Sequence, residues 1–222
     1  MATTAEVRRC TRLRGEPMRG RAAPECDSMS GTTNEGKEFM HYLSHYESPL
    51  GAMTMASDGE HLTGLWFDGQ KYDRSTIDDD AVLQPRLPVF TQTAQWLDAY
   101  FEGADPGFTP PIRVEGSDFK KMVSSTMLSI PFGATSTYAR IAAEVARRMG
   151  RKQMSAQAVG GAVGRNPITL IVPCHRVLAS DGSLRGYAGG VDRKERLLEM
   201  EGVNMSGLST PPAADDGGGR RE

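Results

Sequence analysis

The sequence predicts an α+β protein in which a small antiparallel sheet with one covering helix precedes a mostly helical part that contains a helix-turn-helix. Two observations predict this order. Between residues 40 and 67, apolar residues alternate or run together in short segments separated by turn formers, which is typical of strands. From residue 117 onward, apolar residues recur at helical spacing. A chain of 222 residues is long enough for two such domains.

These patterns divide the chain into four segments. We expect residues 39–115 to form an N-terminal α/β domain and residues 116–204 to form a C-terminal helical domain. Residues 1–38 and 205–222 are rich in charged and small residues and contain few apolar ones. Because such segments bury too little apolar surface to offset chain entropy, we expect two disordered tails.

The net charge of −2 conceals an uneven distribution. Residues 39–115, here called the acidic part, hold 4 Lys and Arg against 12 Asp and Glu. Residues 116–204, the basic part, hold 13 against 7. An asymmetry of this kind points to a phosphate-binding surface on the basic part.

Composition excludes several classes of protein. No apolar run is as long as a membrane span, and the Arg-rich first 30 residues lack the apolar core of a secretory signal. Three cysteines in a chain of this size are not a disulfide framework, and an odd number fits a reducing compartment. We therefore expect a cytoplasmic protein that binds no membrane.

Three strands and a helix are expected in the acidic part. The strands are predicted at 40–46, 52–56 and 61–67, and turns at 48–51 and 57–59 make them an antiparallel meander. Phe90, Ala94, Leu97 and Phe101 then recur at helical spacing, and Gly103 ends the run. We expect the acidic part to carry no chemistry.

The histidines of the acidic part do not predict a metal site. His41, His45 and His61 have no carboxylate or cysteine at ligand spacing. A site made of Cys10, Cys26 and His41 or His45 is an alternative, but these spacings match no zinc pattern. Ordinary packing or surface histidines are expected.

Three helices are predicted in the basic part. Ser117 caps the first helix, and Pro131 follows its end. The second begins near Ser136 and ends at Gly150, with an apolar face opposite a basic one. The third, from 155 to about 165, consists almost wholly of small residues. This order is the outline of a helix-turn-helix.

Two adjacent glycines, Gly160 and Gly161, lie in the middle of the third helix, where each costs about 1 kcal/mol relative to alanine. Such a pair indicates that something approaches the helix closely. DNA and a tightly packed neighbouring helix are the two candidates. The nearby positive charges of Arg151, Lys152 and Arg165 favour DNA, because they suit phosphates better than a buried contact.

Cys174 follows an apolar run at 168–172 that predicts a short buried strand or extended segment closed by Pro173. A thiol with its ordinary pKa of about 8.5 becomes a good nucleophile when a base is held close. His175 is the candidate base. Because adjacent side chains rarely point the same way, we expect the proton to travel through a water. A buried, inert cysteine is the alternative.

The run PCHRV at 173–177 resembles the active-site block of the O6-alkylguanine-DNA alkyltransferases, also called methylated-DNA:protein-cysteine methyltransferases. The resemblance extends over residues from about 40 to 204. It includes AVGGA at 158–162, NP at 166–167, GYAGG at 186–190, Lys194, LL at 197–198, EG at 201–202, IPFG at 130–133, TY at 137–138 and, more loosely, SPLG at 48–51. It implies a ribonuclease H-like N-terminal domain and a winged-helix-like C-terminal domain.

The resemblance implies DNA repair by transfer of the alkyl group of O6-alkylguanine, in double-stranded DNA, to Cys174 after the base is flipped out. O4-alkylthymine is a second candidate substrate. The transfer is expected to be stoichiometric and self-inactivating, because a thioether is a poor leaving group. We expect a monomer that needs no metal or organic cofactor.

The resemblance also implies a role for each site residue. Cys174 is the nucleophile, His175 is the base that acts through water, and Glu201 orients His175 and stabilises its charge. Asn166 holds the turn that positions Cys174, and Tyr138 donates a hydrogen bond to the leaving guanine. The other expected contacts are to the substrate, by Tyr187, Ala188 and Val172, and to DNA, by Gln157, Ala158, Gly160, Gly161, Arg165, Arg151 and Lys152.

Two features depart from the family pattern. The family usually has an arginine at the position of Gln157, where it fills the gap left by the flipped base; glutamine lacks its charge and planar fork, so weaker binding or flipping is expected. The connection between Tyr138 and the third helix is also longer than expected. Its four basic residues would contact phosphates or form a solvated face; they are Arg147, Arg148, Arg151 and Lys152.

Two other functions remain alternatives. The first is a damage-sensing DNA-binding module with little transfer activity, which Gln157 favours and Cys174 opposes. The second is a cysteine hydrolase, which would use the same Cys, His and acid but would not need a basic helix-turn-helix.

Overall fold

The computed structural model describes residues 40–78 and 80–210. The predicted N-terminal tail, and residues 211–222 of the predicted C-terminal tail, lie outside this range.

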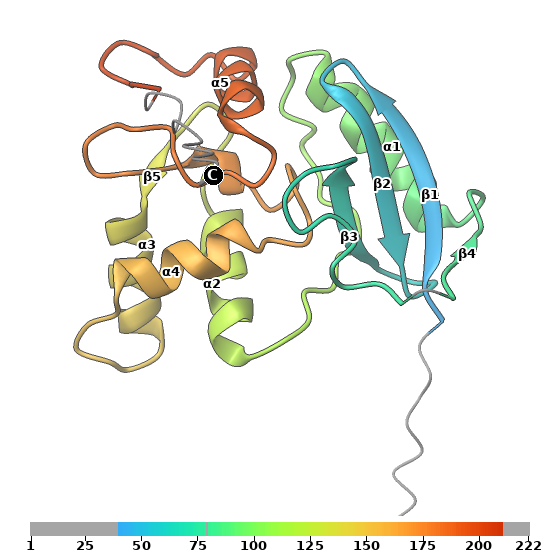
Figure 1. The fold of residues 1–222 in the computed structure, drawn as a ribbon, viewed down its shortest axis with the longest axis horizontal. Helices are drawn as coiled ribbons and strands as arrows, with labels where there is room; N and C mark the ends of the chain where they lie inside the picture. The colour runs from blue at the N-terminus through green and yellow to red at the C-terminus, as the bar shows by residue number, and fades with distance from the viewer. Residues whose placement is uncertain (1–39, 79, 211–222) are drawn as a thin grey trace, which may run out of the picture. The chain divides into compact units, whose positions relative to one another are not determined.

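The acidic part folds into a four-stranded sheet covered by a helix (Figure 1). β1 (Tyr42–Ser48), β2 (Gly51–Ser57) and β3 (Leu62–Phe67) form the predicted antiparallel meander. β4 (Val82–Leu83) pairs parallel with β1 and gives the order β3-β2-β1-β4. The sequence analysis missed β4, because two residues are too few to show a period. α1 (Pro88–Phe101) packs against β1, β2 and β3.

The basic part contains the predicted helices. α2 (Asp118–Leu128), α3 (Tyr138–Arg148) and α4 (Ala156–Gly164) pack against one another. The hydroxyls of Ser117 and Ser155 accept hydrogen bonds from backbone N–H groups in the first turns of α2 and α4, as expected for caps. α3 starts later than predicted, because Ser136–Thr137 forms strand β5, which pairs parallel with β6 (Val177–Leu178). The predicted α+β order is confirmed.

The segment 168–172 is a turn and not the predicted strand or extended segment. Only Ile168 makes a bridge, to Leu65 of β3, and Leu170 has a φ of 69°. The carbonyl of Pro167 accepts from Leu65 N–H at 2.8 Å, and Thr169 N–H donates to the Leu65 carbonyl at 2.9 Å. The apolar run therefore marks burial and not backbone shape. It fixes the turn before Cys174 to the edge of the sheet.

Residues 205–210 correct the predicted start of the C-terminal tail. Met205 and Leu208 pack against a small core cluster of Leu178, Leu184 and Leu198. Ser209 exchanges backbone hydrogen bonds with residues 182 and 184. Two apolar side chains suffice here because they cover a cluster that the helical domain has already formed.

One hydrophobic core runs through both parts. It includes Leu65 and Leu97 from the acidic part and Val145, Val159 and Leu197 from the basic part. Within residues 40–78 and 80–210, no helix is both long and apolar enough to cross a membrane.

Candidate active site

Cys174 lies at the start of a short 3₁₀ helix, η1 (Cys174–Arg176), and is only 4% exposed. The side-chain amide nitrogen of Asn166 lies 3.1 Å from Cys174 Sγ and 2.7 Å from the Val172 carbonyl. The same nitrogen lies 3.1 Å from the Ile168 carbonyl, and Ile168 N–H donates back to Asn166 Oδ1. Asn166 thus ties both ends of the turn together and holds the thiol.

The histidine next to Cys174 is paired with Glu201, which caps the C-terminus of α5 (Val191–Met200). His175 is fully buried, and its Nε2 lies 2.7 Å from Glu201 Oε1. Burial raises the pKa of Glu201, but hydrogen bonds and charge from His175 and Arg176 outweigh it and lower the pKa to about 2. An ionised carboxylate only accepts, so Nε2 carries the proton. The buried Nδ1 has no hydrogen-bond partner among the described residues, and its lone pair is free.

Burial keeps both reacting groups neutral before reaction. It raises the pKa of the Cys174 thiol, which Asn166 and Lys194 only partly oppose, and it lowers the pKa of His175 despite Glu201. A neutral imidazole beside a neutral thiol is the state from which His175 can accept the thiol proton.

Sequence analysis missed three contributors to this network. Arg176, inside the PCHRV run, donates to Glu201 Oε2 from Nε at 2.8 Å and to Oε1 from Nη2 at 2.9 Å. Gly133 N–H donates to Oε2 at 3.1 Å. Tyr100 of α1 donates its hydroxyl to Oε1 at 2.8 Å. Tyr100 lies three residues after Leu97 on the predicted apolar helix face, but nothing in the sequence pairs it with Glu201.

Lys194 of α5 is a further buried residue near the thiol. It is fully buried, and its Nζ donates to the carbonyls of Val177 at 2.6 Å and Arg185 at 3.3 Å. Burial lowers its pKa to about 8, and the nearby Cys174 opposes this by favouring the ammonium form. The resemblance included Lys194 without a role.

A groove of about 780 Å³ separates α4 from the loop at 179–186. It brings together four of the predicted residues, Tyr138, Gln157, Gly160 and Gly161. An added Cβ would lie no closer than 3.8 Å to another atom at Gly160 and 3.5 Å at Gly161, which is ordinary contact. Packing inside the protein therefore does not require these glycines, which disfavours the tight-helix alternative and leaves room for an external partner.

Tyr138 begins α3 and connects the groove with the thiol. Burial and the charge of Cys174 raise the pKa of Tyr138 to about 12, so its hydroxyl remains a donor. The hydroxyl donates to the Arg185 carbonyl at 3.3 Å. Gly186 has a φ of +85°, and a Cβ there would collide with the Tyr138 hydroxyl. This glycine is what lets the loop lie against Tyr138.

A recess of about 340 Å³ contains other predicted residues. Tyr187, Ala188 and Arg165 line it together with Lys71 and Tyr72 of the acidic part. The Arg165 guanidinium lies 5.4 Å from the centre of the Tyr72 ring, and Lys71 N–H donates to the Ala188 carbonyl at 3.2 Å. The acidic part thus contributes to the wall of this recess and, through Tyr100, a hydrogen bond to Glu201, while the expectation that it carries no chemistry of its own stays a prediction.

Val172 is the predicted substrate residue that the structure places elsewhere. Its side chain is fully buried in the core, and its carbonyl accepts from Asn166 and from Cys174 N–H. Val172 belongs to the same core cluster as Cys174 and lines neither the groove beside α4 nor the recess next to Tyr187.

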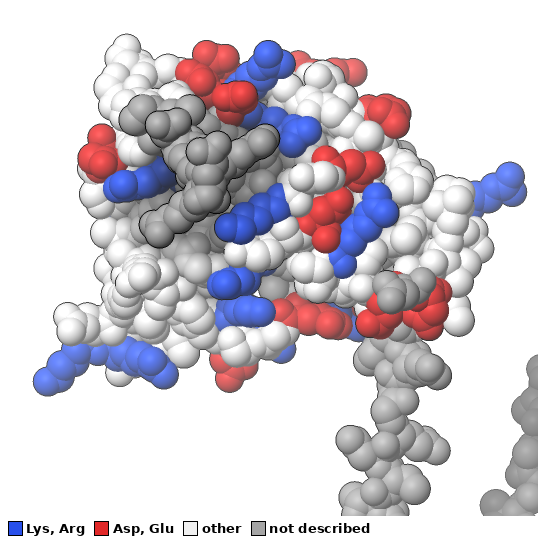
Figure 2. Space-filling view, in the orientation of Figure 1, with Lys and Arg blue, Asp and Glu red and all other residues white. Residues whose placement is uncertain are grey.

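The predicted DNA contacts differ in how free they are. Ala158, Arg151 and Lys152 are exposed, and Figure 2 shows Lys and Arg side chains over the α3–α4 connection that holds the latter two. Arg147 makes two hydrogen bonds to Glu144, at 2.9 and 2.7 Å. The Arg147 guanidinium is therefore less available to bind a phosphate. Arg148 is similarly occupied, because it donates to two hydroxyls of α2 at 3.1 Å.

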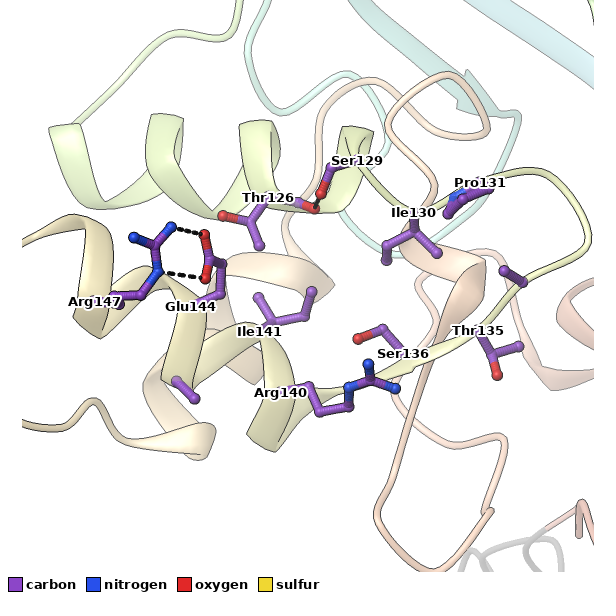
Figure 3. Close-up of a pocket in the computed structure, with 12 residues that line it drawn as sticks. Thr126, Ser129, Ile130, Pro131, Thr135, Ser136, Arg140, Ile141, Glu144 and Arg147 are labelled. Atoms are coloured by element: carbon purple, nitrogen blue, oxygen red, sulfur yellow. Dashed lines mark hydrogen bonds and ion pairs between the residues drawn. The ribbon is translucent and has the colours of Figure 1, made fainter.

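The groove between α2 and α3, of about 750 Å³, contains none of the predicted catalytic residues (Figure 3). Its floor is Ile130 and Ile141, and the Glu144–Arg147 pair lies at one end. It is separate from the groove beside α4.

No metal cluster of three or more His, Cys, Asp or Glu is present in the described part of the chain. His41 lies 3.4 Å from Asp78, and His45 lies 3.4 Å from the Thr54 hydroxyl. Cys10 and Cys26, which the alternative metal site needs, lie outside the described residues.

Two family models cover both parts of the chain. The ribonuclease-like domain of 6-O-methylguanine DNA methyltransferase matches residues 41–114, and the DNA-binding domain of that family matches residues 118–203. Two similar curated proteins, from Mycobacterium tuberculosis and Methanosarcina barkeri, are each named methylated-DNA–protein-cysteine methyltransferase. The Mycobacterium tuberculosis protein is 38% identical over 162 residues, which are 73% of this chain and 92% of that protein. The Methanosarcina barkeri protein is 40% identical over 165 residues, 74% of this chain and 99% of that protein.

Solved structures agree with this assignment. The crystal structure of the M. tuberculosis OGT in complex with DNA matches with a TM-score of 0.63 and 37% identity, over 72% of this chain and 92% of that one. The M. tuberculosis O6-methylguanine methyltransferase matches with the same TM-score and 38% identity, over 73% and 93%. With both domains matched by its models, this chain belongs to the methylated-DNA–protein-cysteine methyltransferase family, whose members bind DNA and transfer methyl groups to a cysteine.

Proposed function

We propose that this protein repairs double-stranded DNA by moving the alkyl group of O6-alkylguanine onto Cys174. The observation that carries the proposal is the buried hydrogen-bonded set of Asn166 with Cys174 and His175 with Glu201. Tyr138 links this set to the groove beside α4, because it lines the groove and its pKa responds to the charge that Cys174 carries when ionised.

Burial of the thiol requires the lesion to leave the duplex. A sulfur in a side chain that is 4% exposed cannot meet a base inside the stack, so the nucleotide must be flipped into the pocket. The α4 surface around Gly160 and Gly161 lets DNA approach, and Gln157 occupies the space left by the base. Ala158 of α4 and the exposed side chains of Arg151, Lys152 and Arg165, which flank α4, contact the DNA backbone.

The transfer needs no reactant beyond protein, DNA and water. The thiol proton passes through a water to Nδ1 of His175, whose Nε2–H is held by Glu201. Sγ then forms a bond to the alkyl carbon as the bond from that carbon to O6 breaks. The electron pair stays on the guanine, which takes up the proton from the imidazolium. The Tyr138 hydroxyl donates to the base as charge develops.

We infer a single turnover, because the thioether on Cys174 is a poor leaving group and the proposed set offers no nucleophile to remove it. All proposed groups come from one chain, which supports a monomer with residues 39–115 and 116–204 as its two domains. A nucleophilic thiol needs a reducing compartment, which supports a cytoplasmic location. O4-alkylthymine presents the same kind of alkyl–oxygen bond and is a second substrate candidate.

A mass-spectrometric experiment tests the proposal. The protein is incubated with excess duplex containing O6-methylguanine, and the expected result is one added methyl group on the peptide with Cys174. A variant with Cys10→Ala and Cys26→Ala should react fully, whereas Cys174→Ala should not react. Unmodified wild-type protein that still binds the lesion would instead favour the damage-sensing alternative, and repeated turnover on an ester would favour the hydrolase.

A further inference from the structure

Tyr100 is the contact between the acidic part and the reacting groups. It lies in α1 and is 1% exposed; its ring stacks on that of Trp96, with centroids 5.1 Å apart, and meets that of Phe132 edge-on, at 6.0 Å. Its hydroxyl donates to Glu201 Oε1 at 2.8 Å and lies 3.3 Å from His175 Nε2. Burial and these ring contacts restrict the side chain and hold the hydroxyl beside the Glu201–His175 pair.

Three donors share Oε1 of Glu201. They are the Tyr100 hydroxyl at 2.8 Å, His175 Nε2 at 2.7 Å and Arg176 Nη2 at 2.9 Å. A carboxylate oxygen offers about two lone-pair sites, so these donors compete. Each bond draws negative charge from the oxygen and weakens its hold on the other two. The strength with which Glu201 attracts the His175 proton therefore depends on the tyrosine.

We infer that Tyr100 is a positioning residue for the proposed transfer: its hydroxyl restrains the pull of Glu201 on His175 and so keeps His175 neutral until the thiol proton arrives. This inference rests on the proposed function. It adds to it a residue from the acidic part that acts through Glu201 and touches neither DNA nor the alkyl group.

The other groups facing His175 do not replace this restraint. Glu201 favours the imidazolium, whereas Arg176 and Lys194 oppose it. The titratable and charged groups around the ring come from α1, η1, the loop before α5, and α5 with its cap: Tyr100, Cys174, Arg176, Tyr187, Lys194 and Glu201. Of these, only Tyr100 is an uncharged donor that shares the oxygen bound by Nε2.

The test is the pH dependence of the single-turnover transfer rate in wild type and Tyr100→Phe. Without the hydroxyl, Glu201 holds the imidazolium more tightly, so His175 stays protonated to a higher pH. We expect the acid limb of the profile to move upward by about half a pH unit to one unit, a part of the effect of losing one hydrogen bond to the carboxylate. The rate above the limb and the affinity for lesion duplex should change little.

A control removes another tyrosine hydroxyl that donates to a carboxylate, one that lies on the exposed side of α1 and away from the site. Tyr46 donates to Asp98 Oδ1 of α1, also at 2.8 Å, but contacts none of the site residues in the network of Glu201. Tyr46→Phe should keep the wild-type profile. Site-specific 3-fluorotyrosine at position 100, a stronger donor, should move the acid limb downward.

Two results would overturn the inference. One is a Tyr100→Phe profile that superimposes on that of wild type, and the other is an equal loss of rate at every pH, which indicates packing alone. Failure of the proposed function looks different, because the wild-type protein would then transfer nothing at any pH.

Discussion

Replacing Glu201 by glutamine tests the charge at the centre of the site. The carboxylate is fully buried and accepts five hydrogen bonds from Tyr100, His175, Arg176 and Gly133. Burial raises its pKa, but His175 and Arg176 outweigh burial and lower the pKa from 4.5 to about 2 in the folded protein. A difference of this size between the folded and unfolded states corresponds to about 3 kcal/mol of stability at neutral pH.

A second argument gives the same magnitude. In Glu201→Gln, Arg176 remains buried with the Ile130 carbonyl at 2.7 Å but loses its counter-charge. Breaking a buried ion pair by neutralising one partner costs about 3–5 kcal/mol. We therefore expect Glu201→Gln to lower the free energy of unfolding by about 3 kcal/mol near neutral pH.

The dependence on pH separates this charge effect from a packing effect. Because the folded pKa lies below the unfolded one, the stabilisation is complete above the unfolded value of 4.5 and is lost as the pH falls through about 2. The difference between wild type and Glu201→Gln should shrink by about 2 kcal/mol between about pH 7 and about pH 3.

Urea unfolding provides the measurement, with the buried Trp66 and Trp96 as fluorescent reporters. Glu199→Gln is the matched control, since Glu199 is exposed on the same helix and should change stability little. A difference that stays constant with pH, or a loss below about 1 kcal/mol, would refute the assignment of Glu201 as an ionised anchor.

Three further predictions concern the thiol and DNA. Asn166→Leu removes the bonds that position Cys174 and should slow single-turnover transfer about 10- to 100-fold with unchanged duplex affinity, and a wild-type rate would contradict its role. Gln157→Arg should tighten lesion binding and steepen the log–log salt dependence of affinity by about 0.9, measured by fluorescence anisotropy; an unchanged slope would show that this position does not meet DNA. Replacing Arg151 and Lys152 together by alanine should reduce the same slope by about 2, and loss of transfer at saturating DNA would contradict a backbone role.

Local chemistry made much of the fold predictable. The strands follow from alternation between turn formers, and Ser117 and Ser155 mark helix starts because their hydroxyls satisfy free N–H groups. The apolar run at 168–172 correctly predicted that this segment is buried, but the predicted extended backbone is wrong. A segment that is buried on all sides shows no alternation of apolar and polar residues from which its backbone conformation could be inferred. Leu170 has a positive φ, which a leucine disfavours by itself; the hydrogen bonds of Pro167 and Thr169 to Leu65 of β3 hold the turn in this shape.

The site divides in the same way. Cys174 and His175 are adjacent in the chain, and the resemblance added Glu201 and Asn166. Tyr100 could not be found this way, because it lies 101 residues from Glu201 and its spacing marks it only as part of an apolar helix face. Contacts of this range are set by how the two parts pack, which periodicity does not report.

The acidic part acts on the site through three separate contacts. Tyr100 donates to Glu201, Lys71 N–H donates to the Ala188 carbonyl in the loop before α5, and the Leu50 carbonyl accepts from Arg193 of α5 at 2.9 Å. Arg193 also donates to Gly189 in that loop at 3.2 Å. The division of charge between the two parts therefore does not divide their work in the proposed reaction: there the basic part supplies the groups for DNA and for the bond that forms, and the acidic part holds Glu201 and the loop that contains Ala188 in position. Because a misplacement of about 1 Å can slow a positioned reaction about a hundredfold, these three hydrogen bonds matter for the proposed transfer although none of them touches the DNA.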